Sequence, residues 1–216
     1  SSKRWLMEML SLHVYCSVRA EGVVATSADE ASWAAVLGKA RRFGEVVARH
    51  CALMDAHDPE RRVGLAVDEW GVWYAPEQAS TASASAASAS AAAEDDAALP
   101  RPMLEQRGTL RDAIAAALCL HSMAAQAERG RVANLAQGVN VLHAPLMVTT
   151  SNSQTAGGSD GGSGNLGSVV IRTPTFHALA LLNRHAGGAR AEAQLRCGLY
   201  TRGPETVAPR LSHLRT

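Results

Sequence analysis

The residues with the most evident chemical potential lie within residues 63–74, where an apolar run leads into Asp68, Glu69 and two tryptophans. The run predicts a β-strand that brings a carboxylate and then indole rings to its carboxyl end, which is where barrel enzymes hold their chemistry. A sugar ring stacks on an indole face while an acidic side chain attacks or stabilises its anomeric carbon. This combination makes Glu69 the first candidate for a catalytic residue.

The neighbouring carboxylates of Asp68 and Glu69 are predicted to point to opposite faces of the strand, so that only one of them can face a pocket. Another interpretation stays open, in which either carboxylate caps a loop or pairs with an arginine. The catalytic interpretation is favoured by the aromatic residues that follow, which are Trp70, Trp73 and Tyr74.

Three further polar residues could reach the same pocket from other strands. Residues 10–15 alternate in polarity, which places His13 and Tyr15 on one strand face, where an imidazole and a phenol could act together. A hydrogen-bonded structural pair is the alternative. Gln137 follows the third predicted strand, and its amide supplies both a donor and an acceptor for a sugar hydroxyl, unless it stabilises a turn instead.

These candidates depend on strands that alternate with helices along the chain. The predicted strands are residues 10–15, 63–67 and 131–136. The predicted helices run from the capping box at 27–30 to about 58, from 109 to about 129, and from 176 to 185, the last opened by residues 173–175 with the proline in its first turn. This alternation predicts an α/β fold with a parallel sheet and right-handed crossovers, which open doubly wound sheets and closed barrels share. A closed barrel needs more than three strands.

Two segments of low complexity interrupt the pattern. Residues 76–103 are mainly Ala and Ser, residues 149–169 are rich in Gly and Ser, and neither segment can bury enough apolar surface to offset its chain entropy. We interpret both segments as insertions within one domain over residues 1–185.

The composition argues against several classes of partner. The 216 residues contain 21 Lys and Arg against 20 Asp and Glu, with no basic or acidic stripe, so nucleic acid and membrane surfaces are not expected as partners. No apolar run is long enough to cross a bilayer. The four cysteines are far apart and are predicted to be buried free thiols. No phosphate-loop, dinucleotide-binding or zinc-protease motif occurs, so neither a cofactor nor a metal is expected.

Five sequence blocks form a series that is more specific than any one of them. They are residues 12–15 (LHVY), 67–74 (VDEWGVWY), 109–113 (TLRDA), 133–142 (ANLAQGVNVL) and 173–177 (TPTFH). Taken together they resemble glycoside hydrolase family 51, the α-L-arabinofuranosidase family, whose order they follow over roughly residues 10–185 apart from the two insertions.

The resemblance implies a fold and a set of site residues. Residues 1–185 would be the C-terminal portion, strands 6 to 8, of a (β/α)8 TIM barrel, and residues 186–216 the start of a C-terminal β-sandwich or a disordered tail. Glu69 would be the nucleophile, and the substrate-binding residues would be His13, Tyr15, Trp73 and Gln137. Arabinose-containing polysaccharides or oligosaccharides are the implied partners, and the full-length protein could form a homo-oligomer. Both cytoplasmic and secreted members exist in the family.

The implied activity is the release of terminal α-L-arabinofuranosyl residues from arabinoxylan or arabinan through a covalent intermediate on Glu69. The family's general acid/base is a glutamate in an Asn-Glu pair, and these residues contain no Asn-Glu, so the resemblance implies a fragment that is inactive alone. Val132 and Gly108 depart from the methionine and asparagine that the family usually has there. Two alternatives stay open: another barrel glycosidase of the same clan, such as an endoglucanase, and a non-catalytic truncated remnant or sugar-binding fragment.

Overall fold

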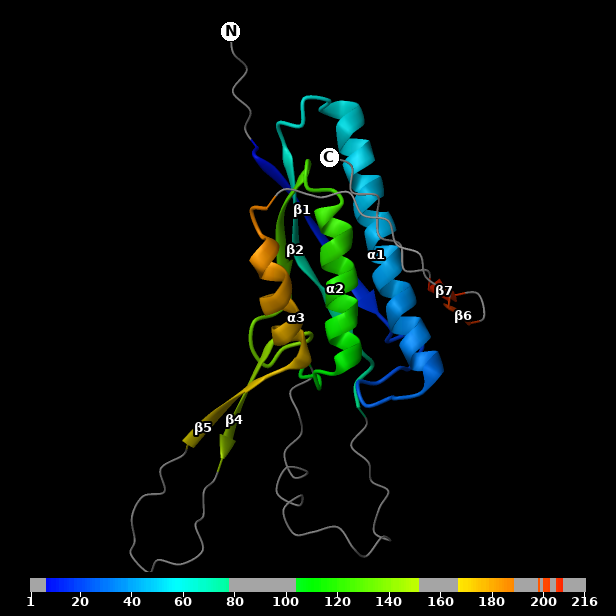
Figure 1. Ribbon diagram of the computed structural model, residues 1–216, viewed down its shortest axis with the longest axis vertical. Helices are drawn as coiled ribbons and strands as arrows, with labels where there is room; N and C mark the ends of the chain where they lie inside the picture. The colour runs from blue at the N-terminus through cyan, green and yellow to red at the C-terminus, as the bar shows by residue number, and fades with distance from the viewer. Residues whose placement is uncertain are drawn as a thin grey trace, which may run out of the picture.

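A three-stranded parallel sheet covered by helices forms the central part of the molecule (Figure 1). The computed structural model describes residues 7–77, 104–151 and 167–188, together with residue 198 and two three-residue strands. The elements are β1 (Met9–Ser17), α1 (Glu30–His57), β2 (Gly64–Trp73), α2 (Leu110–Ala124), β3 (Gly130–Leu135), β4 (Leu146–Ser151), β5 (Gly167–Arg172), α3 (Pro174–Leu182), the 3-10 helix η1 (Asn183–His185), β6 (Tyr200–Arg202) and β7 (Glu205–Val207).

The strand order β1-β2-β3 with parallel pairing confirms the predicted α/β architecture with two helical crossovers. Helices α1 and α2 pack against each other, and α2 also packs against α3, so the three helices lie side by side along the sheet (Figure 1). At Gly44 the backbone of α1 comes so close to α2 that an added Cβ would lie 2.6 Å from the Ser122 hydroxyl oxygen. Glycine is therefore required at this helix contact.

Strand β2 contains an irregularity that changes which of its residues face the helices. The buried core residues along it are spaced by two, three and two positions: Leu65, Val67, Trp70 and Val72. The pairing with β1 shifts at the same place, because Ser11 aligns with Ala66 but His13 aligns with Glu69. Asp68 and Glu69 thus occupy the place of one residue, as in a β-bulge.

The starts of the two long helices differ in how well the sequence predicted them. Helix α2 begins with the predicted capping box, in which Thr109 and Asp112 exchange hydrogen bonds. Helix α1 instead has Asp29 as its N-cap, whose carboxylate accepts from the amide of Ser32, so the predicted cap at Ser27 is two residues too early. Asp and Ser are about equally favoured at this position, but the Ser27 hydroxyl is already engaged in the preceding loop, where it accepts a hydrogen bond from the Val24 amide.

An antiparallel hairpin of β4 and β5 was not predicted from the sequence. Its strands include residues 149–151 and 167–169, which form the two ends of the predicted Gly/Ser-rich insertion. Most of the other predicted insertion, residues 78–103, lies outside the described residues, as does most of the segment 186–216 apart from the hairpin of β6 and β7. Among the helices of the described part, none has the length and apolar character required to cross a membrane.

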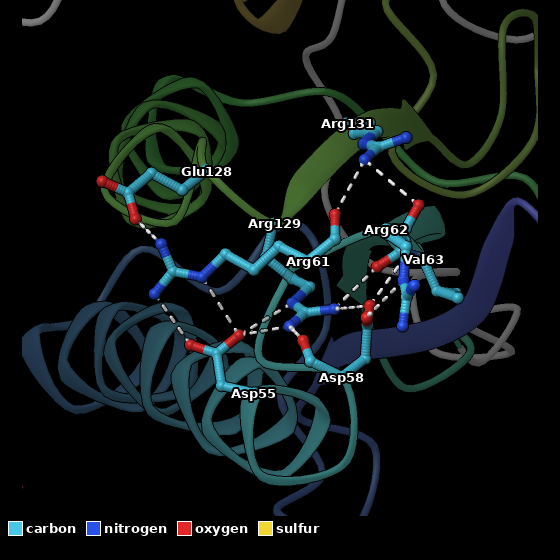
Figure 2. A network of polar contacts seen from close by, with 8 residues as sticks. All are labelled: Asp55, Asp58, Arg61, Arg62, Val63, Glu128, Arg129 and Arg131. Carbon is cyan, nitrogen blue, oxygen red and sulfur yellow. Dashed lines mark hydrogen bonds and ion pairs between the residues drawn. The ribbon is translucent and has the colours of Figure 1, made fainter.

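A network of charged residues joins the amino ends of β2 and β3 to the carboxyl end of α1 (Figure 2). The guanidinium of Arg129, which is 2% exposed, pairs with Asp55 and with Asp58, at 2.5 and 2.9 Å. It also donates to the carbonyl oxygens of Asp58 and Val63. The Val63 amide and the Arg129 guanidinium hold the pKa of Asp58, the C-cap of α1, below its usual value. Arg61 extends the network by pairing with Asp55 and Glu128.

Replacing Arg129 with alanine is expected to destabilise the protein by about 3 kcal/mol, because it leaves the Asp58 carboxylate and two carbonyl groups without their buried partner. The matched control is Arg131→Ala, since Arg131 is exposed and, among the described residues, donates to the carbonyls of Arg61 and Arg62 alone. Its expected cost is about 0.5 kcal/mol. Denaturant unfolding of both variants measures the difference, and equal costs would contradict the buried network as the source of the stability.

Candidate functional site

The candidate site lies where β1 and β2 run side by side around the bulge. The Tyr15 hydroxyl donates to the Glu69 carboxylate at 2.8 Å, and the Ser11 hydroxyl donates to the Asp68 carboxylate at 2.7 Å. His13 lies between them, with Nε2 3.5 Å from Asp68 and Nδ1 3.4 Å from Glu69. Three predicted site residues, His13, Tyr15 and Glu69, are therefore in direct contact.

The expectation that Asp68 and Glu69 point to opposite faces is wrong, because both carboxylates reach the same imidazole. Strict alternation applies only to a regular strand, and the bulge between Val67 and Trp70 interrupts it. The strand also continues to Trp73, so Glu69 lies within β2 and not beyond its end. The irregular 2-3-2 spacing of apolar residues in β2 is the sequence signal that would have revealed this arrangement.

Trp73 forms the aromatic part of the site. Its ring meets Tyr15 edge to face, with the ring centroids 5.2 Å apart, and the guanidinium carbon of Arg19 lies 5.0 Å from the indole centroid. Burial, followed by the hydrogen bond with Glu69, raises the pKa of Tyr15 well above its usual value. Tyr15 therefore stays a hydrogen-bond donor to Glu69 at all physiological pH values.

The other two aromatic residues of the 67–74 block do not belong to an accessible surface. Trp70 is fully buried and packs near Phe43 of α1 and against His143. Tyr74 is 3% exposed, and its hydroxyl donates to Asp112 at 2.5 Å. These two residues therefore stabilise the core, and they no longer add weight to the catalytic interpretation of Glu69.

Arg111, at the start of α2, links the loop after β1 to the segment after β2 through hydrogen bonds. It is 2% exposed, its Nε donates to the Tyr74 hydroxyl at 3.0 Å, and its guanidinium carbon lies 4.9 Å from the Tyr74 ring centroid. Its terminal nitrogens donate to the carbonyls of Ser27, Ala25 and Val24 in the loop between β1 and α1. The segments that follow Tyr15 and Trp73 are thereby fixed to one helix.

A backbone hydrogen bond of the preceding residue places Gln137 near the site. The amide of Ala136 donates to the carbonyl of Trp70 at 2.9 Å, so Gln137 follows directly after a residue that is bonded to β2 beside Glu69. The Ala136–Gln137 peptide bond is cis, and the Gln137 amide donates to the carbonyl of Val141. Its side chain is exposed, and the structure does not bring it into the cluster around His13.

His143 is a buried residue that the sequence analysis did not single out. Its Nδ1 accepts from the Val72 amide at 3.0 Å, so Nε2 carries the hydrogen and donates to the Thr175 hydroxyl at 2.9 Å. Burial lowers the pKa of His143. Gly71 has a φ of +150°, and a Cβ there would lie 2.9 Å from the Cβ of His143. A neutral His143 thus links β2 to the start of α3.

The chemistry open to this arrangement is that of an oriented carboxylate beside an aromatic surface. Glu69 accepts a hydrogen bond from Tyr15 and is still 39% exposed, so a ligand can approach it. Within the described ranges, no group of three or more His, Cys, Asp or Glu side chains is arranged to hold a metal ion. Of the four cysteines, Cys16, Cys51 and Cys119 are buried free thiols, as predicted.

Comparisons with known proteins agree on one group of enzymes. A family model described as the alpha-L-arabinofuranosidase C-terminal domain matches residues 68–160. The chain is 26% identical over 195 residues to an intracellular exo-alpha-L-arabinofuranosidase of Bacteroides ovatus. The aligned region covers 88% of this chain and 30% of that protein.

Two solved structures are also similar. A GH51 arabinofuranosidase from Xanthomonas axonopodis pv. citri matches 93% of this chain and 34% of its own, with 31% identity and a TM-score of 0.66. A family 51 alpha-L-arabinofuranosidase from Bifidobacterium longum matches 83% of this chain and 30% of its own, with 22% identity and a TM-score of 0.51, and this second likeness concerns the fold alone. The chain thus spans about a third of the length of these relatives.

The buried neutral His143 is expected to make the free energy of unfolding depend on pH. Above its ordinary pKa of 6.5 the imidazole is neutral in both states. Below that value the unfolded chain binds a proton that the folded protein excludes, so stability is lost by up to about 1.4 kcal/mol per pH unit until the folded pKa is reached. His143→Gln keeps a donor and an acceptor but does not titrate.

Denaturant unfolding of the protein and of the His143→Gln variant at pH 7.5 and 5.5 measures this effect. The carboxylates contribute equally in both proteins, so their contribution cancels in the comparison. We expect a smaller loss of stability between the two pH values in the variant. The same loss in both proteins would show that His143 is not held neutral by burial.

Proposed function

Because the chain belongs to the family 51 α-L-arabinofuranosidases and spans about a third of the length of its relatives, we propose that the complete protein is a retaining glycoside hydrolase with Glu69 as its nucleophile. The observation that carries this proposal is the geometry of Glu69. Its carboxylate accepts a hydrogen bond from Tyr15, faces His13, and stays accessible beside Trp73.

The proposed reaction has two steps. An oxygen of the Glu69 carboxylate attacks the anomeric carbon, the bond to the leaving oxygen breaks with its electron pair, and a general acid protonates that oxygen. The deprotonated general acid then acts as a base and removes a proton from water. The resulting hydroxide attacks the anomeric carbon, releases the sugar from Glu69 and so regenerates the free Glu69 carboxylate. A retaining pair of carboxylates stands about 5 to 5.5 Å apart. We propose that the second one is the family's Asn-Glu glutamate, supplied by a part of the complete protein that precedes these residues.

The proposed substrate is a non-reducing terminal α-L-arabinofuranosyl residue on arabinoxylan or arabinan. The named activity of the Bacteroides ovatus relative, exo-cleavage of α-L-arabinofuranosides, supports this choice. Trp73 offers an indole face on which a sugar ring can stack, and His13 and Tyr15 offer hydrogen bonds next to Glu69. Gln137 is proposed to bond a sugar hydroxyl, and its exposed position after β3 leaves its amide open to a ligand.

We further propose that β1, β2 and β3 are strands 6 to 8 of a (β/α)8 barrel formed by residues 1–185, and that residues 186–216 begin a β-sandwich. The parallel sheet with helical crossovers supports the first part. Strands β1 and β3 form the edges of this sheet, and Met7, Met9 and Leu10 are exposed at the start of β1. Further barrel strands would pair with these edges and cover such side chains.

In the complete protein, Glu69→Ala is expected to reduce the hydrolysis of an aryl α-L-arabinofuranoside by about a thousandfold or more, because it removes the carboxylate that forms the proposed covalent intermediate. Glu45→Ala is the matched control, since Glu45 lies on α1, away from the candidate site, and pairs with the nearby Arg41. We expect the control to keep the activity of the unchanged protein. Retention of most activity by Glu69→Ala would refute the assignment of the nucleophile.

The polymer on which the complete protein acts separates the proposed activity from its rivals. We expect arabinose to be released from arabinoxylan and arabinan, with no release of reducing sugar from cellulose, because the similarity of the chain is to arabinofuranosidases. Chromatography of the released sugars measures both. Cleavage of cellulose would favour an endoglucanase of the same clan, and binding of arabinan without hydrolysis would favour a non-catalytic sugar-binding protein.

A further inference from the structure

A chain of four polar residues runs across β1 and β2 and ends at Glu69. The Ser11 hydroxyl donates to Asp68 Oδ1 at 2.7 Å, the same oxygen lies 3.5 Å from His13 Nε2, and His13 Nδ1 lies 3.4 Å from Glu69 Oε2. Asp68 therefore contacts His13 on the side away from Glu69. None of the roles assigned to the site so far explains why a second carboxylate stands there.

From this geometry we propose that Asp68 is a positioning residue, held by Ser11, that orients the imidazole of His13 toward the nucleophile. The inference rests on the proposed function, because it concerns the same reaction at Glu69. Asp68 acts through His13 and is not required to touch the substrate.

The arrangement constrains the imidazole through the chemistry of its two nitrogens. A carboxylate can only accept hydrogen bonds, so a ring nitrogen that faces a carboxylate is placed to interact with it through a hydrogen. His13 is half exposed, at 51%, and its ring would otherwise be free to rotate. With Asp68 facing Nε2, Nδ1 is turned toward Oε2 of Glu69, the oxygen that accepts a hydrogen bond from Tyr15. Glu69 is thus contacted from two directions.

Asp68 meets the two requirements of such a role, a fixed position and a negative charge. The bulge in β2 turns its side chain to the same side as that of Glu69, and the hydrogen bond from Ser11 fixes one of its oxygens. That hydrogen bond also holds the pKa of Asp68 below its usual value. Asp68 therefore carries its negative charge at neutral pH.

The test uses the complete protein and an aryl α-L-arabinofuranoside, with kcat and KM measured separately. Asp68→Asn keeps the shape and an acceptor for Ser11 but removes the charge. We expect kcat/KM to fall about tenfold, as for the loss of one hydrogen bond to a charged group, with KM nearly unchanged. Asp68→Glu retains the charge and should keep more activity than Asp68→Asn, although its side chain is longer.

Ser11→Ala provides the matched test of the chain of contacts. It should lower kcat/KM in the unchanged protein and have a smaller effect in the Asp68→Asn background, because Ser11 acts by holding the charged carboxylate of Asp68. Independent, additive effects of the two substitutions would overturn the inference. So would equal losses in Asp68→Asn and Asp68→Glu together with lower unfolding temperatures, which would mark a purely structural role.

Glu69→Ala in the same assay separates this inference from the proposed function. If Glu69→Ala is inactive and Asp68→Asn is fully active, the function stands and the positioning role of Asp68 is refuted. If Glu69→Ala is active, the proposed nucleophile itself is wrong. Complete inactivity of Asp68→Asn with residual activity of Glu69→Ala would show that Asp68 is the reacting carboxylate and would overturn both assignments.

Discussion

The buried guanidinium of Arg111 is the group on which the arrangement of the site edge depends. A cation removed from water must find acceptors for its hydrogens, and Arg111 finds them in the loop after β1 and in Tyr74 after β2. Because Arg111 also belongs to the first turn of α2, both loops are fixed relative to a rigid helix. The strand ends that carry Tyr15 and Trp73 are therefore held in place. The buried guanidinium of Arg111 thus determines where the aromatic part of the site lies.

The bulge in β2 then decides which side chains meet. A regular strand would place Asp68 and Glu69 on opposite faces, and one of them would enter the apolar layer between the sheet and the helices. The extra residue keeps Trp70 in the core while it leaves both carboxylates on the side of His13. Core packing and site chemistry are thus satisfied by the same local irregularity, which explains why a strand so rich in buried residues can also carry two acids.

The sequence predicted the parts of the structure that follow from periodicity and from local hydrogen bonding. The three parallel strands, the two long helices, the capping box at Thr109 and the proline at the start of α3 all have signals within a few residues. The grouping of His13, Tyr15 and Glu69 followed from parallel pairing and from the family resemblance. The common face of Asp68 and Glu69, the burial of Trp70 and the role of His143 depend on tertiary contacts. A pattern of alternation or an aromatic residue type does not reveal these.

The charged network around Arg129 lies at the amino ends of the strands (Figure 2). The residues proposed for catalysis lie further along β1 and β2. The two clusters share no residue, and each is linked to its own loops. Substitutions in the loops beside the candidate site therefore need not disturb the contacts that align the strands. The two ends of this sheet are thus separate modules, one that aligns the strands and one that presents the side chains of the candidate site.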